Sequence, residues 1–125
     1  SINSFYAASE FVSRDEFKTF AGGFLRRQPG IQALEWIPRV TAEKRQEYEA
    51  RARQDGIADF AIKEREADGN LVPARERDAY FPVYYLVPHA GNERVLGFDL
   101  GSDTARLSTL SKARASPASL PSAVA

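Results

Sequence analysis

The chain has 125 residues, a length that fits one domain with a buried hydrophobic core. Its 17 basic and 17 acidic side chains give a formal net charge of zero, which disfavours a nucleic-acid partner, a polybasic membrane contact or an acidic substrate. The absence of cysteine excludes disulfides, thiol chemistry and cysteine-ligated zinc. No apolar run approaches the roughly 20 residues that span a bilayer, and because the chain begins at Ser1 without a leader we expect it to be a segment of a longer protein.

Two helices are predicted before residue 29. Residues 1–12 carry one apolar stripe at spacings of three and four, which indicates a helix cut from a longer one. The members of this stripe are Ile2, Phe5, Ala8 and Val12. A second helix is predicted from Arg14 to Arg27, because Ser13 and Glu16 have the spacing of a capping box.

The middle of the chain contains two predicted strands with a helix between them. Ile31–Ile37 is predicted to be a strand, and Thr41–Gln54 is predicted to be a surface helix that ends at Gly56. Ile57–Glu66 is predicted to be a further strand, which the turn residues 68–70 fold back into a hairpin or a flap.

The central element of the predicted fold is a β-hairpin. Tyr80–Val87 and Val95–Leu100 are rich in large strand-forming side chains, and Gly91 and Asn92 suit the turn between them. Neither strand alternates between apolar and polar residues. This pattern indicates that both faces are covered, one by the core and the other by helices or a pocket.

After this hairpin, Ser102 or Asp103 is expected to cap a last helix. Helices packed on an antiparallel sheet make an α+β fold. We therefore predict a single domain over 1–125, with N-terminal helices in 1–28, a sheet with helices in 29–116, and an irregular tail in 117–125.

The candidate chemical motifs are weak. His89 stands alone at the mouth of the central turn, and without cysteine or a carboxylate cluster beside it no metal site is predicted. Two acid pairs stand where helices are expected to begin, a place where acids interact favourably with the helix dipole. These pairs are Asp15 with Glu16 and Asp99 with Asp103. The sequence has neither a phosphate-binding glycine loop with a lysine nor a nucleophile elbow, so a hydrolase or an NTPase is not supported, and no cofactor is predicted.

Four blocks of the sequence resemble the CHASE domain, the extracytoplasmic ligand-sensing module of bacterial sensor histidine kinases and diguanylate cyclases and of plant cytokinin receptors. The blocks are ALEWIPRV at 33–40, RQEYEARARQDG at 45–56, YFPVYYLVP at 80–88 and NERVLGFDLGSD at 92–103. SRDEF at 13–17 and KARAS at 112–116 are also similar to the family, so the resemblance covers nearly the whole chain.

The resemblance implies a PAS-like sheet carried on a long N-terminal helix and placed between two membrane-spanning helices. Such a module reports ligand binding to a cytoplasmic output domain and performs no catalysis. Because the family continues after Ser116 into a second, membrane-proximal half, the resemblance implies that this chain is the N-terminal, membrane-distal part. The plant receptors hold adenine with an aspartate, and this chain has no acid at the corresponding place around Pro88 and His89.

The leading hypothesis is a small-molecule sensor in the periplasmic or extracellular part of an inner-membrane protein. That protein is expected to be a histidine kinase of a two-component system or a diguanylate cyclase. The expected partners are a small-molecule ligand, the membrane through flanking helices outside this chain, and a second copy bound through the N-terminal helix. The alternative is a structural or dimerisation module without a ligand, and an enzyme fragment is supported only by unpaired acids.

The predicted ligand site lies on one face of Tyr80–Val87. Alternate residues of a strand share a face, which separates the face of Tyr85 from that of Tyr84. The face of Tyr85 is chosen because its hydroxyl can orient a ligand above an apolar floor. The predicted ligand-binding residues are Phe81, Val83, Tyr85, His89 and Leu110, the last two of which close the site.

Overall fold

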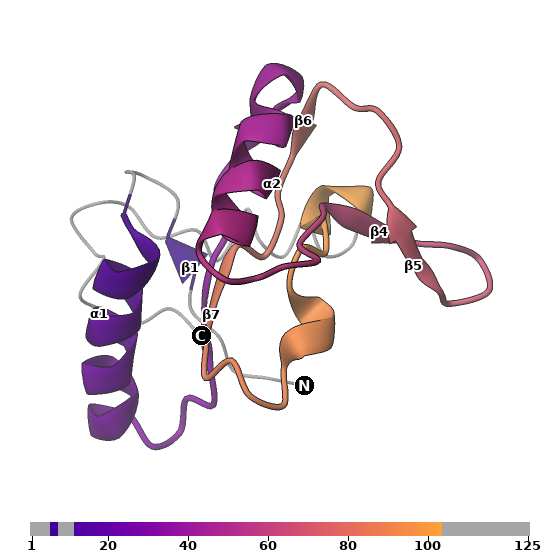
Figure 1. Cartoon of the computed structure of the whole chain (residues 1–125). Coiled ribbons are helices and arrows are strands. Elements are labelled where there is room, and N and C mark those ends of the chain that lie inside the picture. The colour runs from indigo at the N-terminus through magenta and orange to yellow at the C-terminus, as the bar shows by residue number, and fades with distance from the viewer. Residues whose placement is uncertain (1–5, 8–11, 104–125) are drawn as a thin grey trace.

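The computed structural model describes residues 6–7 and 12–103. These residues form two α-helices, short strands and short 3-10 helices (Figure 1). In chain order the elements are β1 (Tyr6–Ala7), α1 (Arg14–Arg27), β2 (Leu34–Trp36), β3 (Val40–Thr41), η1 (Ala42–Lys44), α2 (Arg45–Gln54), β4 (Lys63–Arg65), β5 (Leu71–Pro73), β6 (Ala79–Tyr80), β7 (Tyr85–Val87), η2 (Glu93–Val95) and η3 (Leu100–Ser102). Helices packed with small sheets confirm the predicted α+β fold.

The strands form three small sheets. The largest has the order β1–β2–β7, in which β1 runs parallel and β7 antiparallel to β2. Glu35 of β2 lies between Tyr6 of β1 and Leu86 of β7 in this register. The other two sheets are antiparallel pairs, β3 with β6 and β4 with β5.

The predicted central hairpin is confirmed only in part. Within Tyr80–Val87 only the two ends are strands, and β7 pairs with β2 rather than with Val95–Leu100. The second segment contains parts of η2 and η3. It still pairs antiparallel with residues 81–83, through the bridge between Pro82 and Asp99 and through three backbone hydrogen bonds. Val83 N–H donates to the Phe98 carbonyl oxygen, Gly97 N–H to that of Val83, and Leu100 N–H to that of Phe81. Two residues prevent a regular ladder, because Pro82 has no N–H to donate and Gly97 turns the chain with a φ of +88°.

The N-terminal segment also departs from its prediction. Tyr6 and Ala7 form β1, so a continuous helix over 1–12 is wrong at these two residues. Their extended backbone pairs with the buried strand β2, a long-range partner that the spacing of apolar residues does not reveal. Most of the apolar stripe, the predicted last helix and the tail lie outside the described residues. The homodimer expected through this segment therefore stays a prediction.

Helix α1 begins and ends where the sequence predicts. The Ser13 hydroxyl accepts a hydrogen bond from Glu16 N–H at 3.1 Å, and Glu16 Oε1 accepts one from Ser13 N–H at 2.8 Å, which confirms the capping box. These hydrogen bonds lower the pKa of the Glu16 carboxyl. Phe17 and Phe24 are buried against the sheet side of the helix, whereas Phe20 is 37% exposed.

The predicted third helix and the predicted hairpin after it are confirmed with shorter bounds. The helix expected over Thr41–Gln54 is divided into η1 and α2, and Gly56 follows it with a φ of +108°. The strand expected over Ile57–Glu66 is only β4, because residues 57–62 follow an irregular path along α2. The turn at 68–70 then joins β4 to β5.

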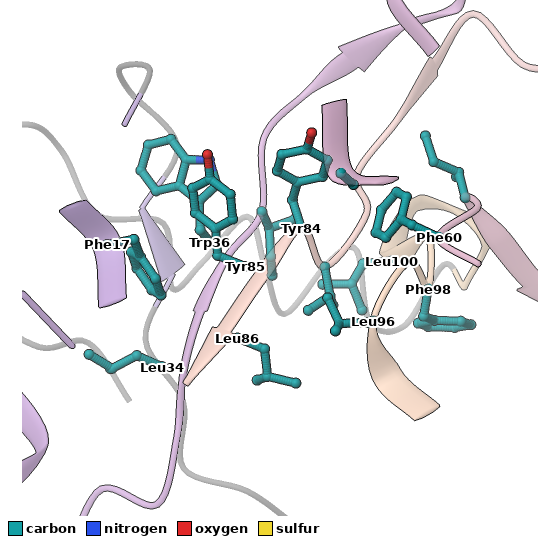
Figure 2. Close-up of a cluster of buried hydrophobic side chains, with 14 of the residues drawn as sticks. Phe17, Leu34, Trp36, Phe60, Tyr84, Tyr85, Leu86, Leu96, Phe98 and Leu100 are labelled. Carbon is teal, nitrogen blue, oxygen red and sulfur yellow. The ribbon is translucent and has the colours of Figure 1, made fainter. Parts of the chain in front are cut away.

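Aromatic side chains form a row through the core (Figure 2). The Phe17 ring lies 6.3 Å from Trp36 and 5.7 Å from Tyr85 between centroids, and Tyr84 meets Phe60 edge-on at 5.4 Å. Aromatic pairs of this kind add roughly 0.5–1.5 kcal/mol each beyond their area of burial. Through the contacts of Phe17 with Trp36 and Tyr85, α1 packs against the sheet. Consecutive residues of β7 are both buried, which confirms that the strand is covered on both faces.

Candidate functional site

A polar cavity of about 370 Å³ lies where the start of α1 meets the end of α2 beside β7. We call it the α1–α2 cavity. Its lining residues are Ser13, Arg14, Asp15, Arg51, Asp55 and Tyr85. The capping box places Ser13, Arg14 and Asp15 at the head of α1, and Arg51 and Asp55 belong to the last turn of α2 and its C-cap. The cavity therefore joins three elements that are distant in the sequence.

Arg14 connects all three elements. Its Nε lies 3.1 Å from Asp55 Oδ2, and its Nη1 donates a hydrogen bond of 3.2 Å to the Tyr84 carbonyl oxygen. The guanidinium carbon lies 4.7 Å from the ring centroid of Tyr85 and 5.3 Å from that of Tyr84. A cation over an aromatic face gains roughly 0.5–2 kcal/mol, more as water is excluded. Arg14 thereby holds the head of α1 against α2 and the sheet.

The hydroxyl groups of Tyr84 and Tyr85 bond to the main chain. Tyr85 Oη donates to the Val12 carbonyl oxygen at 2.6 Å, and Tyr84 Oη donates to the Tyr48 carbonyl oxygen at 2.7 Å. Burial raises the pKa of each phenol to about 12, so both are neutral at physiological pH. Because the Tyr85 hydroxyl is engaged by Val12, the side chain contributes its ring as a wall of the cavity.

The structure does not bring the described members of the predicted ligand site into one cavity. Tyr85 lines the α1–α2 cavity, whereas His89 is exposed and lines a separate cavity of about 290 Å³. Val83 is 1% exposed and its N–H donates to the Phe98 carbonyl oxygen. Phe81 is half-buried, and its N–H donates to Asp99. Leu110 lies outside the described residues.

Sequence reasoning missed the charged residues of the α1–α2 cavity. Arg14 and Asp55 are 41 positions apart, and no local spacing predicts that they meet. In the structure Arg51 pairs with Glu47 at 3.8 Å, and Asp15 lies in the first turn of α1, where the sequence predicts it. Both local roles are compatible with lining a cavity. The only available signal was the position of these residues at the ends of two predicted helices.

A second polar cluster surrounds Asp99, which is fully buried. Its Oδ1 accepts hydrogen bonds from Phe81 N–H at 2.7 Å and Gly101 N–H at 2.9 Å, and its Oδ2 lies 3.7 Å from Arg77 Nη1. Burial raises the pKa of Asp99, although these donors and Arg77 oppose that shift. Burial also opposes the charge of Glu64, but hydrogen bonds from Arg77 and Arg75 hold the pKa of that carboxyl below its usual value. Through these hydrogen bonds Asp99 holds the segment of Phe81 against that of Gly101, which is a structural role.

The raised pKa of Asp99 predicts a pH effect on stability. Because the folded chain binds this proton more tightly than the unfolded chain, the contribution of Asp99 to stability decreases as pH rises through its folded pKa. This decrease begins near pH 3.8, the ordinary pKa of an aspartate, and continues toward higher pH. We expect the unfolding free energy of the wild type, measured relative to Asp99→Asn, to fall as pH rises above the ordinary aspartate pKa of 3.8. Urea denaturation at several pH values checks this, and a difference that grows with pH contradicts it.

Two kinds of site are absent from residues 6–7 and 12–103. No group of three or more histidine, aspartate or glutamate side chains is placed to hold a metal ion in this part of the chain. Among the same residues, neither helix has the length and apolar character needed to cross a bilayer.

Comparison with known proteins gives the family. The family model of the CHASE domain matches residues 10–122. Hybrid signal transduction histidine kinase A of Dictyostelium discoideum is 26% identical over 111 residues, which cover 82% of this chain and 5% of that kinase. The chain thus spans a small part of the length of this relative. CHASE domains are extracytoplasmic sensor domains of signalling receptors. The resemblance of the four sequence blocks is confirmed, and the chain belongs to the CHASE domain family.

Proposed function

We propose that this chain is the small-molecule-sensing domain of a membrane-bound signalling receptor. It lies in the periplasm or outside the cell, is tethered by helices that flank it, and passes ligand binding to a cytoplasmic histidine kinase or diguanylate cyclase. The observation that carries the proposal is the match of the CHASE family model to residues 10–122. The similarity to a histidine kinase supports a kinase as the output.

The α1–α2 cavity supports this function through its position. A ligand transmits a signal only if it binds two arrangements of the receptor with different affinity. A molecule in this cavity touches the head of α1, the end of α2 and the ring of Tyr85 together. Any relative movement of these elements alters its contacts, so occupancy and the position of α1 are coupled. Arg14 bridges the same elements, which makes it the side chain through which the coupling passes.

The proposal predicts that a small molecule stabilises the chain by mass action. A ligand present at 100 times its dissociation constant adds about 2.7 kcal/mol to the unfolding free energy. For a domain of this size that corresponds to a rise in Tm of about 10 °C. A thermal-shift screen of amino acids, purines and small carboxylates measures it. A structural or dimerisation module without a ligand shows no shift with any compound, and that result contradicts the proposal.

The sequence of the gene on either side of this chain tests its localisation. An apolar segment of about 20 residues on each flank, followed by a kinase or cyclase domain, is the expected result. A gene without such segments contradicts the membrane tether while leaving the thermal-shift result to decide ligand binding.

A further inference from the structure

We propose that the α1–α2 cavity binds a compact zwitterion, that is, a molecule with a free ammonium group and a free carboxylate, such as an amino acid. The inference rests on the proposed sensor function and adds the chemical class of the ligand and the place where it binds. It follows from the charges around the cavity, from the hydrogen-bonding capacity that the described residues leave unused there, and from the size of the space.

The charges around the cavity balance. Its ionised lining residues are two guanidinium groups, Arg14 and Arg51, and two carboxylates, Asp15 and Asp55. A ligand with a net charge is attracted by one pair and repelled by the other. A zwitterion that places its ammonium near the carboxylates and its carboxylate near a guanidinium gains from both pairs. The cavity is therefore complementary to a dipolar ligand.

The two carboxylates retain acceptor capacity for an ammonium group. Asp55 uses Oδ2 for Arg14, and its Oδ1 has no hydrogen bond within the described part of the chain. Within residues 12–103, the side chain of Asp15 forms no hydrogen bond or ion pair. Hydrogen bonds between an ammonium and a carboxylate are about twice as strong as neutral ones. Both aspartates can therefore accept hydrogen bonds from an ammonium group in the cavity.

Arg51 is suited to the carboxylate of the ligand. Its guanidinium pairs with Glu47 at 3.8 Å, and the two side chains are 42% and 56% exposed. An exposed ion pair at this distance contributes little stability, so a ligand carboxylate can compete with Glu47 at small cost. The planar guanidinium also matches a carboxylate with two parallel hydrogen bonds. Arg14 is already held by Asp55 and Tyr84, and it adds positive potential without reorganising.

The volume of the cavity limits the ligand to a compact molecule. Ligand cavities commonly measure about 300–1,000 Å³, and the α1–α2 cavity, at about 370 Å³, is near the lower limit. The ring of Tyr85 provides an aromatic wall, whose face is partly covered by Arg14. A molecule with a small side chain fits this space better than a large heterocycle.

The first experiment measures which charge of the ligand is required. Isothermal titration calorimetry is performed on the whole 125-residue chain with the twenty standard L-amino acids. Each amino acid that binds is then compared with its N-acetyl form, which has lost the ammonium, and with its amide, which has lost the carboxylate. We expect at least one amino acid to bind and both derivatives to bind about tenfold more weakly or worse. A derivative that binds as tightly as its parent overturns the proposal.

The second experiment locates the two charges. We expect Asp15→Asn to weaken the binding of the amino acid about tenfold and to leave the residual binding of its N-acetyl form unchanged. We expect Arg51→Gln to weaken the binding of the amino acid and to leave the residual binding of its amide unchanged. Asp59→Asn and Arg94→Gln are matched controls, because both residues are exposed and lie outside the cavity. Equal effects in the control variants contradict the assigned site.

The results separate this inference from the sensor function. Binding of a purine or a dicarboxylate in the thermal-shift screen, together with no binding of any amino acid, overturns the zwitterion and leaves the sensor function standing. A chain that binds none of these compounds contradicts both proposals.

Discussion

Gly97→Ala is expected to lower the unfolding free energy by about 2–5 kcal/mol. Gly97 has a φ of +88°, where a residue with a Cβ costs about 1–2 kcal/mol. In addition, a Cβ at this position would clash with the carbonyl oxygen of Ala61, a backbone atom that cannot turn aside. Overpacking of this kind adds about 1–3 kcal/mol. The sum is a large fraction of the roughly 5–15 kcal/mol that stabilises an ordinary domain.

Gly91→Ala is the matched control for this substitution. Gly91 has almost the same φ, +87°, but an added Cβ meets no atom within 4 Å. Gly91→Ala therefore has the cost of a Cβ at positive φ but no steric clash. We expect it to lower the unfolding free energy by only about 1–2 kcal/mol. Urea denaturation of both variants measures the difference. Equal losses would show that the segment of Ala61 moves aside, and they would contradict the close approach.

The position of Gly97 explains why the central hairpin is less regular than predicted. Gly97 N–H donates to the Val83 carbonyl oxygen, and its own carbonyl accepts from Lys63 N–H. The segment is thus held between two distant parts of the chain and is buried on all sides. A buried segment and a strand share the same apolar composition, so the pattern indicated burial correctly but the extent of the pairing only in part. Pairing of β7 with β2 joins residues about 50 positions apart, and no local signal encodes it.

The elements predicted correctly depend on local interactions. Helix α1 begins at a capping box whose two hydrogen bonds join Ser13 and Glu16, three positions apart. The hairpin of β4 and β5 turns at Asp68, whose Oδ1 accepts from Asn70 N–H at 3.0 Å. Such contacts are determined by neighbouring residues and can be read without knowledge of the fold. The α1–α2 cavity depends instead on how two helices pack, which is why its charged residues were missed.

Arg45→Met is expected to lower the unfolding free energy by about 3 kcal/mol. The Arg45 guanidinium donates to the carbonyl oxygens of Ala74 and Ile62 at 2.8 and 3.3 Å, to Tyr80 Oη at 3.1 Å and to Glu49 Oε2 at 3.2 Å. The guanidinium carbon of Arg45 also lies 4.9 Å from the ring centroid of Tyr80. Desolvation opposes its charge, but the hydrogen bonds to Tyr80 and Glu49 raise the pKa of Arg45. One side chain thus joins α2 to three other segments.

The size of this effect follows from the groups that Arg45 would leave behind. Methionine keeps most of the apolar stem but removes every donor, so two carbonyl groups and the carboxylate of Glu49 lose a partner. An unsatisfied buried group costs about 1–3 kcal/mol, and removing one side of a buried ion pair costs about 3–5 kcal/mol. For the Arg45–Glu49 pair we expect a smaller cost than this, because the two side chains are still 18% and 12% exposed. Glu49 also retains its hydrogen bond from Ile62 N–H.

Lys44→Met is the matched control for Arg45→Met. Lys44 precedes Arg45 in the chain and pairs with Glu47 at 3.5 Å, with both side chains more than half exposed. An exposed pair of this kind contributes about 0.2–1 kcal/mol, so we expect a loss below about 1 kcal/mol. Arg45→Lys completes the series, because it keeps the charge and removes the fork of donors, and it should fall between the two. If Arg45→Met and Lys44→Met lose the same free energy in urea, the network around Arg45 does not hold α2 in place.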